Sequence, residues 1–419
     1  MLNRSVFPAL GALILMSSPA LAGTWYVNGV NGDDGNSCKT RAAACATIGH
    51  AISLAASGDT IQIAAATYQE NLSIPVNLTL NGARAATTIV DGGVNGDGNS
   101  GGTVFTVGAG ISLTLSNLTI KDGNGGFYSG GGGVNNAGTL TVNNSNFYVN
   151  TALSGGAILN TGTAIVSDTN FTGNSPLFFG RSASCGAIDN RSTMTITAST
   201  FYDNYANNNF TSGGAICNGG TLTITASTFS TNASQGNNGG YGGAIYTYAG
   251  TLTVTNSTFS QNSATTSGGA IYSGGGIVQI SNSTFGTNPE NIGGGGALSN
   301  AGSSVLIQNS IVANNGNGGN CSGTITSDGN NLSSDSTCHF SSAGDINSKN
   351  PRLAALRSNG GPTQTMALPN GSPALDAGNP AGCRDFSGNL LKTDQRGQPR
   401  PGGGETTGCD MGAYESQTY

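Results

Sequence analysis

The sequence predicts an all-β protein whose chain winds into a single parallel β-helix solenoid. Two recurring patterns predict it: a quartet close to Gly-Gly-Ala-Ile, and a Phe that an Asn follows three residues later. The Phe register begins at Ile120 and reaches Val312, which is seven steps over 192 residues, or 27 residues a step. A repeat of this length is typical of a solenoid whose coils contact only neighbouring coils. The Phe positions are Phe147, Phe171, Phe201, Phe229, Phe259 and Phe285.

The strand of each coil is predicted from alternation just before the Phe. Residues 221–225, for example, read Thr-Leu-Thr-Ile-Thr, and period two with one apolar face indicates a half-buried strand. Stacked strands repeat every 4.8 Å or so, which places like residues over like. We therefore expect the Phe column to lie in the core and the Asn column to form an amide ladder that satisfies the turn backbone. The Asn positions are Asn150, Asn174, Asn204, Asn232, Asn262 and Asn288.

One edge of the coil is variable in length. The quartet lies 15 or 16 residues before the Phe, whereas four to ten residues separate the Asn from the next quartet. Insertions in repeat proteins gather on one face, often the binding face. Exposed aromatic residues there can contact sugar rings or protein partners, and the alternative is that they fold back as local caps. The candidate ligand-binding residues are Phe178, Phe179, Tyr205, Phe210 and Tyr241 on this edge, with Tyr246 and Tyr272 in one outward column.

Both ends of the chain differ from the repeat. Residues 1–22 have the pattern of a secretory signal peptide, with Arg4, an apolar run and a small-residue cleavage site. We predict a β-helix over 23–345, whose first part, 23–60, is an N-terminal cap with a short helix over 46–57 that covers the solenoid end. Residues 346–419 are predicted to form an irregular C-terminal cap. No stretch of the mature chain approaches the roughly 20 apolar residues of a transmembrane helix.

The charge pattern excludes nucleic acid as a partner. Charged residues make up 8% of the chain and the formal net charge is -6. Between residues 100 and 340 the basic residues are Lys121, Arg181 and Arg191, too few to track a phosphate backbone. We expect a monomer that is secreted, at the cell surface or associated with the outer membrane, with glycans or host and cell-surface proteins as partners.

Eight cysteines in an exported chain favour disulfides. Three pairs are close in sequence: Cys38 with Cys45, Cys321 with Cys338, and Cys383 with Cys409. Alignment of the quartets offsets Cys185 and Cys217 by four positions, about 13 Å along a strand, beyond the roughly 7 Å limit between bridged Cα atoms. This fourth pair is expected to form only if the segment before Gly186 bends out of the strand.

Three stretches resemble known families. Residues 27–92, with NGDDGNSC, ATIGHAI and GDTIQI, resemble the opening of right-handed parallel β-helix proteins of the pectate-lyase-like superfamily. The GGAI and FxxN units resemble those of polymorphic outer-membrane proteins and related bacterial surface solenoids. The run NPRLAALRSNGGPTQTMALPNGSPALDAGN, with DQRGQPRP and CDMGAYES, resembles the C-terminal segment of choice-of-anchor Q domain proteins. These resemblances imply that the chain is a right-handed β-helix of a surface protein. They do not identify any catalytic residue in this sequence.

Catalysis on such a scaffold requires clustered charge. The densest set holds Asp168, Arg181, Asp189, Arg191 and Asp203, which would suit a polysaccharide lyase or glycoside hydrolase. The column alignment instead places Asp168 in a polar stack, Asp189 where other coils have Leu159 and Tyr246, and Asp203 in a turn. The sequence therefore favours solvated or stacked carboxylates over a catalytic cluster.

Calcium is the one cofactor that the sequence suggests. Carboxylates alternate with amides in two Gly-rich loops, which suits an ion that prefers oxygen ligands, although such loops are also ordinary turns. The candidate ligands are Asp33, Asp34, Asp91 and Asp97.

We conclude that the sequence favours an exported, non-catalytic surface or secreted protein of the adhesin, matrix or glycan-binding type. The alternative is a polysaccharide lyase or glycoside hydrolase on the same scaffold. A third reading is an ice- or crystal-binding face made by the outward Thr columns, but Ile165, Gln279 and Leu306 interrupt those columns.

Overall fold

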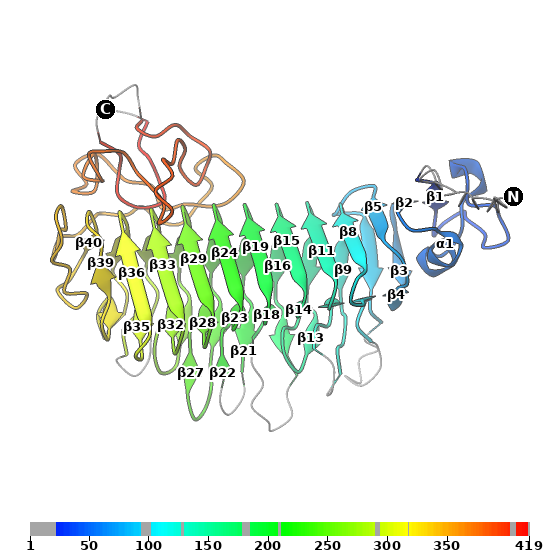
Figure 1. Ribbon diagram of the computed structural model, residues 1–419, viewed down its shortest axis with the longest axis horizontal. Helices are drawn as coiled ribbons and strands as arrows, with labels where there is room; N and C mark the ends of the chain where they lie inside the picture. Colours follow the sequence, from blue (N-terminus) through cyan, green and yellow to red (C-terminus); the bar gives the residue numbers. More distant parts are fainter. Residues whose placement is uncertain are drawn as a thin grey trace, which may run out of the picture.

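The computed structural model describes residues 22–93, 102–126, 130–177, 185–207, 211–289, 294–316, 318–402 and 408–417. The chain forms coils that stack along the long axis of the molecule, each coil adding one strand to each of three parallel sheets (Figure 1). The fold is a right-handed parallel β-helix, which confirms the predicted fold class.

Sheet 1 holds the alternating strands that the sequence predicts, in the order β1 Thr24–Val27, β2 Asp59–Ile63, β5 Leu78–Gly82, β8 Ser112–Ser116, β11 Thr139–Asn143, β15 Thr163–Ser167, β19 Thr193–Thr197, β24 Thr221–Thr225, β29 Thr251–Thr255, β33 Ile277–Ser281, β36 Ser304–Gln308 and β39 Thr326–Ser327.

Sheet 2 carries the Phe column, in the order β3 Ala66–Gln69, β6 Thr88–Asp91, β9 Thr119–Lys121, β12 Asn146–Tyr148, β16 Asn170–Thr172, β20 Thr200–Tyr202, β25 Thr228–Ser230, β30 Thr258–Ser260, β34 Thr284–Gly286, β37 Ile311–Ala313 and β40 Leu332–Ser333.

Sheet 3 follows the Gly-Gly-Ala quartets, in the order β4 Leu72–Ile74, β7 Phe105–Val107, β10 Val134–Asn136, β14 Ile158–Asn160, β18 Ile188–Asn190, β23 Ile216–Asn218, β28 Ile245–Thr247, β32 Ile271–Ser273, β35 Leu298–Asn300 and β38 Cys321–Ser322. Two-residue strands line the variable edge: β13 Thr151–Ala152 with β17 Ser175–Pro176, then β21 Tyr205–Ala206, β26 Ala233–Ser234 and β31 Ser263–Ala264, and finally β22 Thr211–Ser212 with β27 Gly240–Tyr241.

The stacked Phe rings form the centre of the core. From Phe147 to Phe285 successive rings are stacked with nearly parallel planes, and their centroids are 4.5 to 4.9 Å apart. All six side chains are fully buried. The spacing follows from the strand repeat, because side chains at the same position of adjacent coils are held one strand separation apart. The predicted Phe column is confirmed.

Two amide ladders run parallel to the axis. The predicted ladder starts with Asn150 Nδ2 donating to Asn174 Oδ1 at 3.0 Å, and continues coil by coil to Asn288. Each of its amides also donates to a carbonyl of the Phe register in the preceding coil: Asn150 Nδ2 donates to Ile120 O at 3.0 Å, and the later amides donate to Phe carbonyls, as Asn174 Nδ2 does to Phe147 O at 3.0 Å. A second ladder, at the end of the sheet 3 strands, runs from Asn136 to Asn218. These bonds satisfy buried polar groups at two corners of each coil, the one after the sheet 2 strand and the one after the sheet 3 strand.

Helix α1, Ile48–Leu54, lies at the N-terminal end of the solenoid together with the 3₁₀ turn η1, Arg41–Ala43 (Figure 1). The helix buries Ile48, Ala51 and Ile52. Its first amides need partners outside the helix, and Glu70 supplies them by accepting from Ile48 N at 2.8 Å and Gly49 N at 2.7 Å. Within the described residues, no helix has the length and apolar character needed to cross a membrane.

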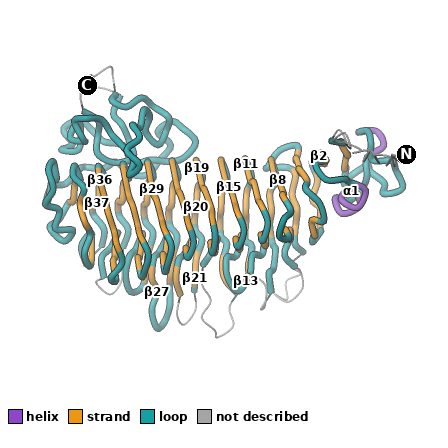
Figure 2. The backbone as a smooth tube through the Cα atoms, viewed as in Figure 1, coloured by secondary structure: helices purple, strands orange, loops and turns teal. Residues whose placement is uncertain are grey.

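Residues 346–402 and 408–417 have almost no regular secondary structure (Figure 2). They lie along one flank of the solenoid, against the corners between sheets 1 and 2 in successive coils (Figure 1). The contacts include Thr258 Oγ1 donating to Gln395 Oε1 at 2.6 Å, and Asn282 Nδ2 donating to Arg384 O at 2.8 Å. The boundary at 345/346 itself stays a prediction.

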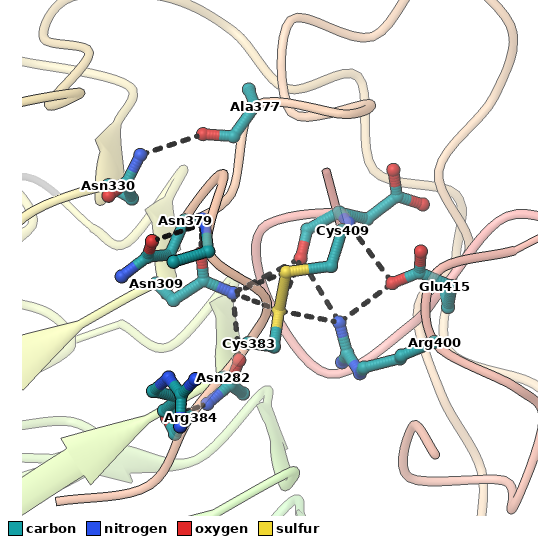
Figure 3. The surroundings of a disulfide bond; sticks show 12 residues. Asn282, Asn309, Asn330, Ala377, Asn379, Cys383, Arg384, Arg400, Cys409 and Glu415 are labelled. Carbon is teal, nitrogen blue, oxygen red and sulfur yellow. Dashed lines mark hydrogen bonds and ion pairs between the residues drawn. A yellow bond between two sulfur atoms is a disulfide. The ribbon is translucent and has the colours of Figure 1, made fainter. Parts of the chain in front are cut away.

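A buried polar network holds this C-terminal segment (Figure 3). Asn309, in the corner before β37, donates to the sulfur of Cys383 at 2.8 Å and to the carbonyl of Asp410 at 3.2 Å. Arg400 Nη1 pairs with Glu415 Oε2 at 2.9 Å, and both side chains are 1% exposed. The segment is therefore fastened to the solenoid by polar contacts as well as by the small apolar cluster around Met411.

Disulfides join Cys38 to Cys45, Cys321 to Cys338, and Cys383 to Cys409, as the sequence pairing anticipates. A fourth joins Cys185 to Cys217, with a Cα–Cα distance of 5.2 Å. The condition set in the sequence analysis is met: the separation of about 13 Å along a strand does not apply, because residue 185 does not continue the strand. Its backbone is left-handed, with φ of 72°, and this corner brings Cys185 next to Cys217 in the following coil.

Candidate functional site

Two outward-facing columns on sheet 3 carry the candidate site. In β18 the first and third residues, Ile188 and Asn190, are fully buried, so the middle residue points outward. The middle residues of β18, β23, β28 and β32 are Asp189, Cys217, Tyr246 and Tyr272. The residue after each strand starts the corner toward sheet 1, and in the first three of these coils it is Arg191, Gly219 and Tyr248.

A cavity of about 310 Å³ lies over these coils. The middle coil of the three presents a small side chain, Cys217, in one column and no side chain, Gly219, in the other. The larger side chains of the coils on either side therefore become the walls. We call this cavity the Asp189 cavity. Its lining residues are Leu153, Ser154, Cys185, Asp189, Arg191, Cys217, Tyr246 and Tyr248.

The carboxylate of Asp189 is partnered on one oxygen. Oδ2 accepts from Ser154 Oγ at 2.7 Å, and from Nε and Nη2 of Arg191 at 2.8 and 2.6 Å. Oδ1 is buried and has no hydrogen-bond partner among the described residues. Asp189 is 3% exposed, whereas the Arg191 side chain is 51% exposed. The ion pair thus has one buried member and one member that reaches into solvent.

Burial and charge set the ionisation of these groups. Burial lowers the pKa of Arg191, but the hydrogen bond and the charge of Asp189 outweigh it and raise that pKa above the ordinary value. The pKa of Tyr248 is raised by burial first and by the charge of Asp189 second. Burial, followed by the neighbouring tyrosines, also raises the pKa of Tyr246 and Tyr272. The phenols therefore stay neutral and able to donate hydrogen bonds at ordinary pH.

Four tyrosines continue from the cavity along sheet 3, and we call them the tyrosine shelf: Tyr241, Tyr246, Tyr248 and Tyr272. The ring centroids of Tyr246 lie 5.9 Å from Tyr248 and 5.6 Å from Tyr272. Tyr241 reaches the shelf from β27 on the variable edge, with its centroid 4.8 Å from that of Tyr272. The variable edge and the outward column, separate in the sequence analysis, meet at this point.

The described residues among the remaining sequence candidates lie apart from the cavity and the shelf. Asp168, in the corner between β15 and β16, is exposed with φ of 49°, and Asp203, just after β20, is exposed with φ of 55°. These corners border sheet 2, whereas Asp189 and Arg191 lie on sheet 3. Tyr205, in β21, is 36% exposed. Phe178, Phe179, Arg181 and Phe210 lie outside the described residues.

The described calcium candidates form hydrogen bonds or ion pairs with other residues of the chain. Asp34 accepts from Ala46 N, Thr47 N and Thr47 Oγ1 at 2.9 to 3.0 Å, just before α1. Asp33 accepts from Gly35 N at 2.8 Å, and Asp91 pairs with Lys121 Nζ at 2.9 Å. Asp97 lies outside the described residues. Within the described part of the chain, the one group of three potential ligand atoms is Cys38, Cys45 and His50, and its two sulfurs form a disulfide.

Sequence reasoning missed Ser154, Gly219 and Tyr248. Ser154 reaches Asp189 from the preceding coil, a contact 35 residues apart in the chain, and carries no repeat signal. The other two could have been found, because Arg191, Gly219 and Tyr248 share one corner position in three successive coils. Alignment of the residues that follow each quartet would have shown this column.

No protein-family model matches the chain, and no curated protein matches it. XylC, solved in complex with xylose, superposes with a TM-score of 0.50 at 9% sequence identity, over 93% of this chain and 98% of its own. A pectin methylesterase from carrot superposes with a TM-score of 0.37 at 15% identity, over 63% of this chain and 84% of its own.

The chain has a pectate-lyase-like parallel β-helix fold. The likeness to XylC, at 9% identity, extends to the fold alone, since one fold hosts many activities. The resemblances of the repeats to polymorphic outer-membrane proteins, and of the C-terminal motifs to choice-of-anchor Q proteins, stay predictions.

Proposed function

We propose that this chain is an exported β-helix protein that binds glycans on the tyrosine shelf and does not cleave them. The observation that carries the proposal is the convergence of Tyr241, Tyr246, Tyr248 and Tyr272 on one face. Aromatic rings offer a large apolar surface with a polar hydroxyl, which suits a ligand that is apolar on its ring faces and polar at its rim. XylC, a protein of similar fold, was solved with a sugar, xylose.

Export is supported by two observations. Residues 1–22 have the pattern of a signal peptide. The chain has four disulfides, and disulfides form and persist mainly in oxidising compartments outside the cytosol. A secreted or surface-bound protein meets extracellular and cell-wall glycans, which agrees with the proposed ligand class.

The enzymatic alternative is a lyase or hydrolase centred on Asp189 and Arg191. Glycoside hydrolases use two carboxyl groups about 5 to 9.5 Å apart. Among the described residues that line the cavity, Asp189 is the single carboxylate. Arg191 already pairs with it at 2.6 Å and is held in the charged form, which makes it a poor proton acceptor. This arrangement favours binding over cleavage.

A binding titration on a glycan array tests the proposal. We expect Tyr246→Ala and Tyr272→Ala each to weaken the binding of the recognised glycan about tenfold, as loss of a central aromatic contact does. The matched control is Tyr148→Ala, which removes a tyrosine that is 49% exposed on sheet 2, and Thr223→Ala on sheet 1 is a second control. Equal losses in the controls and in the shelf variants, or binding of proteins but no glycans, would overturn the proposal.

An activity assay separates the two readings. The glycans that bind are incubated with the full mature chain and analysed for unsaturated uronates and for new reducing ends. We expect neither product. Turnover that Asp189→Asn or Arg191→Ala abolishes would establish the enzymatic alternative.

A further inference from the structure

We infer that the Asp189 cavity is a subsite that holds one residue of a neutral glycan through two adjacent hydroxyl groups. This inference rests on the proposed function and adds the ligand class and the polar contacts. It starts from the buried Oδ1 of Asp189, which has no partner among the described residues. A buried acceptor without a hydrogen bond costs about 1 to 3 kcal/mol, and more when the group is charged. A ligand that displaces the side chains covering Oδ1 and then donates to this oxygen removes the cost.

The other oxygen of Asp189 explains why the acceptor is held in place. Ser154 and Arg191 contact Oδ2 at 2.6 to 2.8 Å, which fixes the carboxylate orientation before any ligand arrives. A group positioned in advance loses little conformational entropy on binding. Oδ1 is therefore a rigid acceptor. It belongs to a residue that is only 3% exposed.

Arg191 places donors beside this acceptor. Nε and Nη2 each direct one N–H group at Asp189 Oδ2. A guanidinium carries five N–H groups in all. The remaining hydrogens belong to a side chain that is 51% exposed. One hydroxyl of a ligand can donate to Asp189 Oδ1 while its neighbour accepts from Arg191. Adjacent ring hydroxyls, each both a donor and an acceptor, match this pair of groups.

The walls of the cavity suit a sugar ring. Tyr246 and Tyr248 stand on the side opposite Asp189 with their rings tilted by 33°, and they offer ring faces to the C–H groups of a sugar. The volume of about 310 Å³ is at the lower end of the range of about 300 to 1,000 Å³ for small-molecule sites. This size fits one sugar residue, and the tyrosine shelf beyond Tyr246 continues toward Tyr272 for the next.

The charge of the site selects neutral sugars. Arg191 offsets the charge of Asp189 through two contacts to one oxygen, so no net positive charge is left to attract an anion. A uronate carboxylate in the cavity would lie beside Asp189, and like charges at close range repel strongly where burial limits screening. Neutral glycans should therefore bind more tightly than uronates of equal length.

The test compares two probes of the same linkage on the full mature chain by titration calorimetry: neutral cellohexaose, and β-1,4-linked hexaglucuronate, which differs from it by the carboxylates. We expect the parent to bind the neutral probe at least tenfold more tightly than the acidic one. Tighter binding of hexaglucuronate would overturn the inference and leave the proposed function intact. If neither probe binds and no glycan on the array binds, both the inference and the proposed function are overturned.

Asp189→Leu is the decisive variant, because Leu159 occupies the same column in the preceding coil and the fold accepts Leu there. We expect at least a tenfold loss of neutral-glycan affinity with an unchanged unfolding midpoint. Asp189→Asn, which keeps the shape, and Arg191→Gln, which removes the donors, should each weaken binding several-fold and serve if the Leu variant fails to fold. Tyr148→Ala is the control. Full affinity in the Asp189 variants, with loss in Tyr246→Ala, would place the contacts on the shelf alone and overturn the subsite.

Discussion

The ring of Tyr248 lies directly over Gly219 in the preceding coil: a Cβ built on Gly219 would come within 2.3 Å of Cζ and of the hydroxyl oxygen of Tyr248. Gly219 does not have a positive φ, so its backbone accommodates any residue. The glycine is needed for the space that it leaves. It allows the tyrosine to fold back toward Arg191 and to close one wall of the Asp189 cavity.

Gly219→Ala should therefore disturb binding without disturbing the fold. The added methyl group displaces the far end of the Tyr248 side chain, and we expect glycan affinity to fall about tenfold, or ~1.4 kcal/mol. The free energy of unfolding should change by no more than about 0.5 kcal/mol. The control is Gly108→Ala at the equivalent corner, where the nearest atom to a Cβ is 4.0 Å away. A similar loss of affinity in both variants would contradict the role of Tyr248.

Phe229→Ala should strongly destabilise the solenoid. The Phe229 ring is fully buried and stacks on both neighbours, with centroids at 4.5 and 4.7 Å. Loss of a buried Phe costs about 3 to 5 kcal/mol, through lost transfer energy and the cavity left behind. Urea unfolding measures the change, and Tyr148→Ala on the surface should cost less than about 0.5 kcal/mol. Equal midpoints for Phe229→Ala and the parent would refute the packing of the column.

Loss of the Cys185–Cys217 disulfide should affect both stability and binding. The bond closes a loop of 32 residues, and removing such a cross-link costs about 2 to 4 kcal/mol. The double variant Cys185→Ser with Cys217→Ser should therefore unfold at lower denaturant, and its glycan affinity should fall because the disulfide lines the cavity. Cys38→Ser with Cys45→Ser, at the other end of the molecule, should lower stability but leave affinity unchanged. Unchanged affinity in the first double variant would mean that the disulfide does not shape the cavity.

The C-terminal segment should become less stable as pH rises. Burial raises the pKa of Glu415 from 4.5 to about 7, although the charge of Arg400 acts in the opposite direction. The folded chain then binds a proton more tightly than the unfolded chain. The stabilising contribution is full below pH 4.5 and is lost as pH rises through about 7. At 1.36 kcal/mol per pKa unit, a shift from 4.5 to about 7 corresponds to about 3 kcal/mol.

Urea unfolding of the parent and of Glu415→Gln at pH 5, 6, 7 and 8 checks this prediction. The Gln side chain is neutral at every pH, so the difference in stability between the two proteins should vary across this window. We expect the parent to lose stability relative to Glu415→Gln as pH rises. A relative gain instead would mean that Arg400, 2.9 Å away, keeps Glu415 ionised in the folded state.

Sequence periodicity was sufficient for the body of the fold. Phe229 and Asn232 could be placed in the core and in the amide ladder because each coil repeats its neighbour, and parallel stacking puts identical side chains one strand spacing apart. The same register places Asp189 in one column with Tyr246 and Tyr272, and predicts that the two tyrosines face outward. It could not give the contacts made across that column.

Only the tertiary structure decided the contacts that break the repeat. The left-handed backbone at Cys185 turned an expected separation of about 13 Å into a disulfide, and Ser154 reached Asp189 from a loop whose path no pattern encodes. Gln395 met Thr258 across 137 residues, which placed the C-terminal segment along the flank. Periodic signals report contacts between equivalent positions of adjacent coils, which the shared strand geometry determines. Loop paths and the docking of a non-repeating segment depend instead on the balance of many weak, non-equivalent contacts, which become defined only when the whole chain is folded.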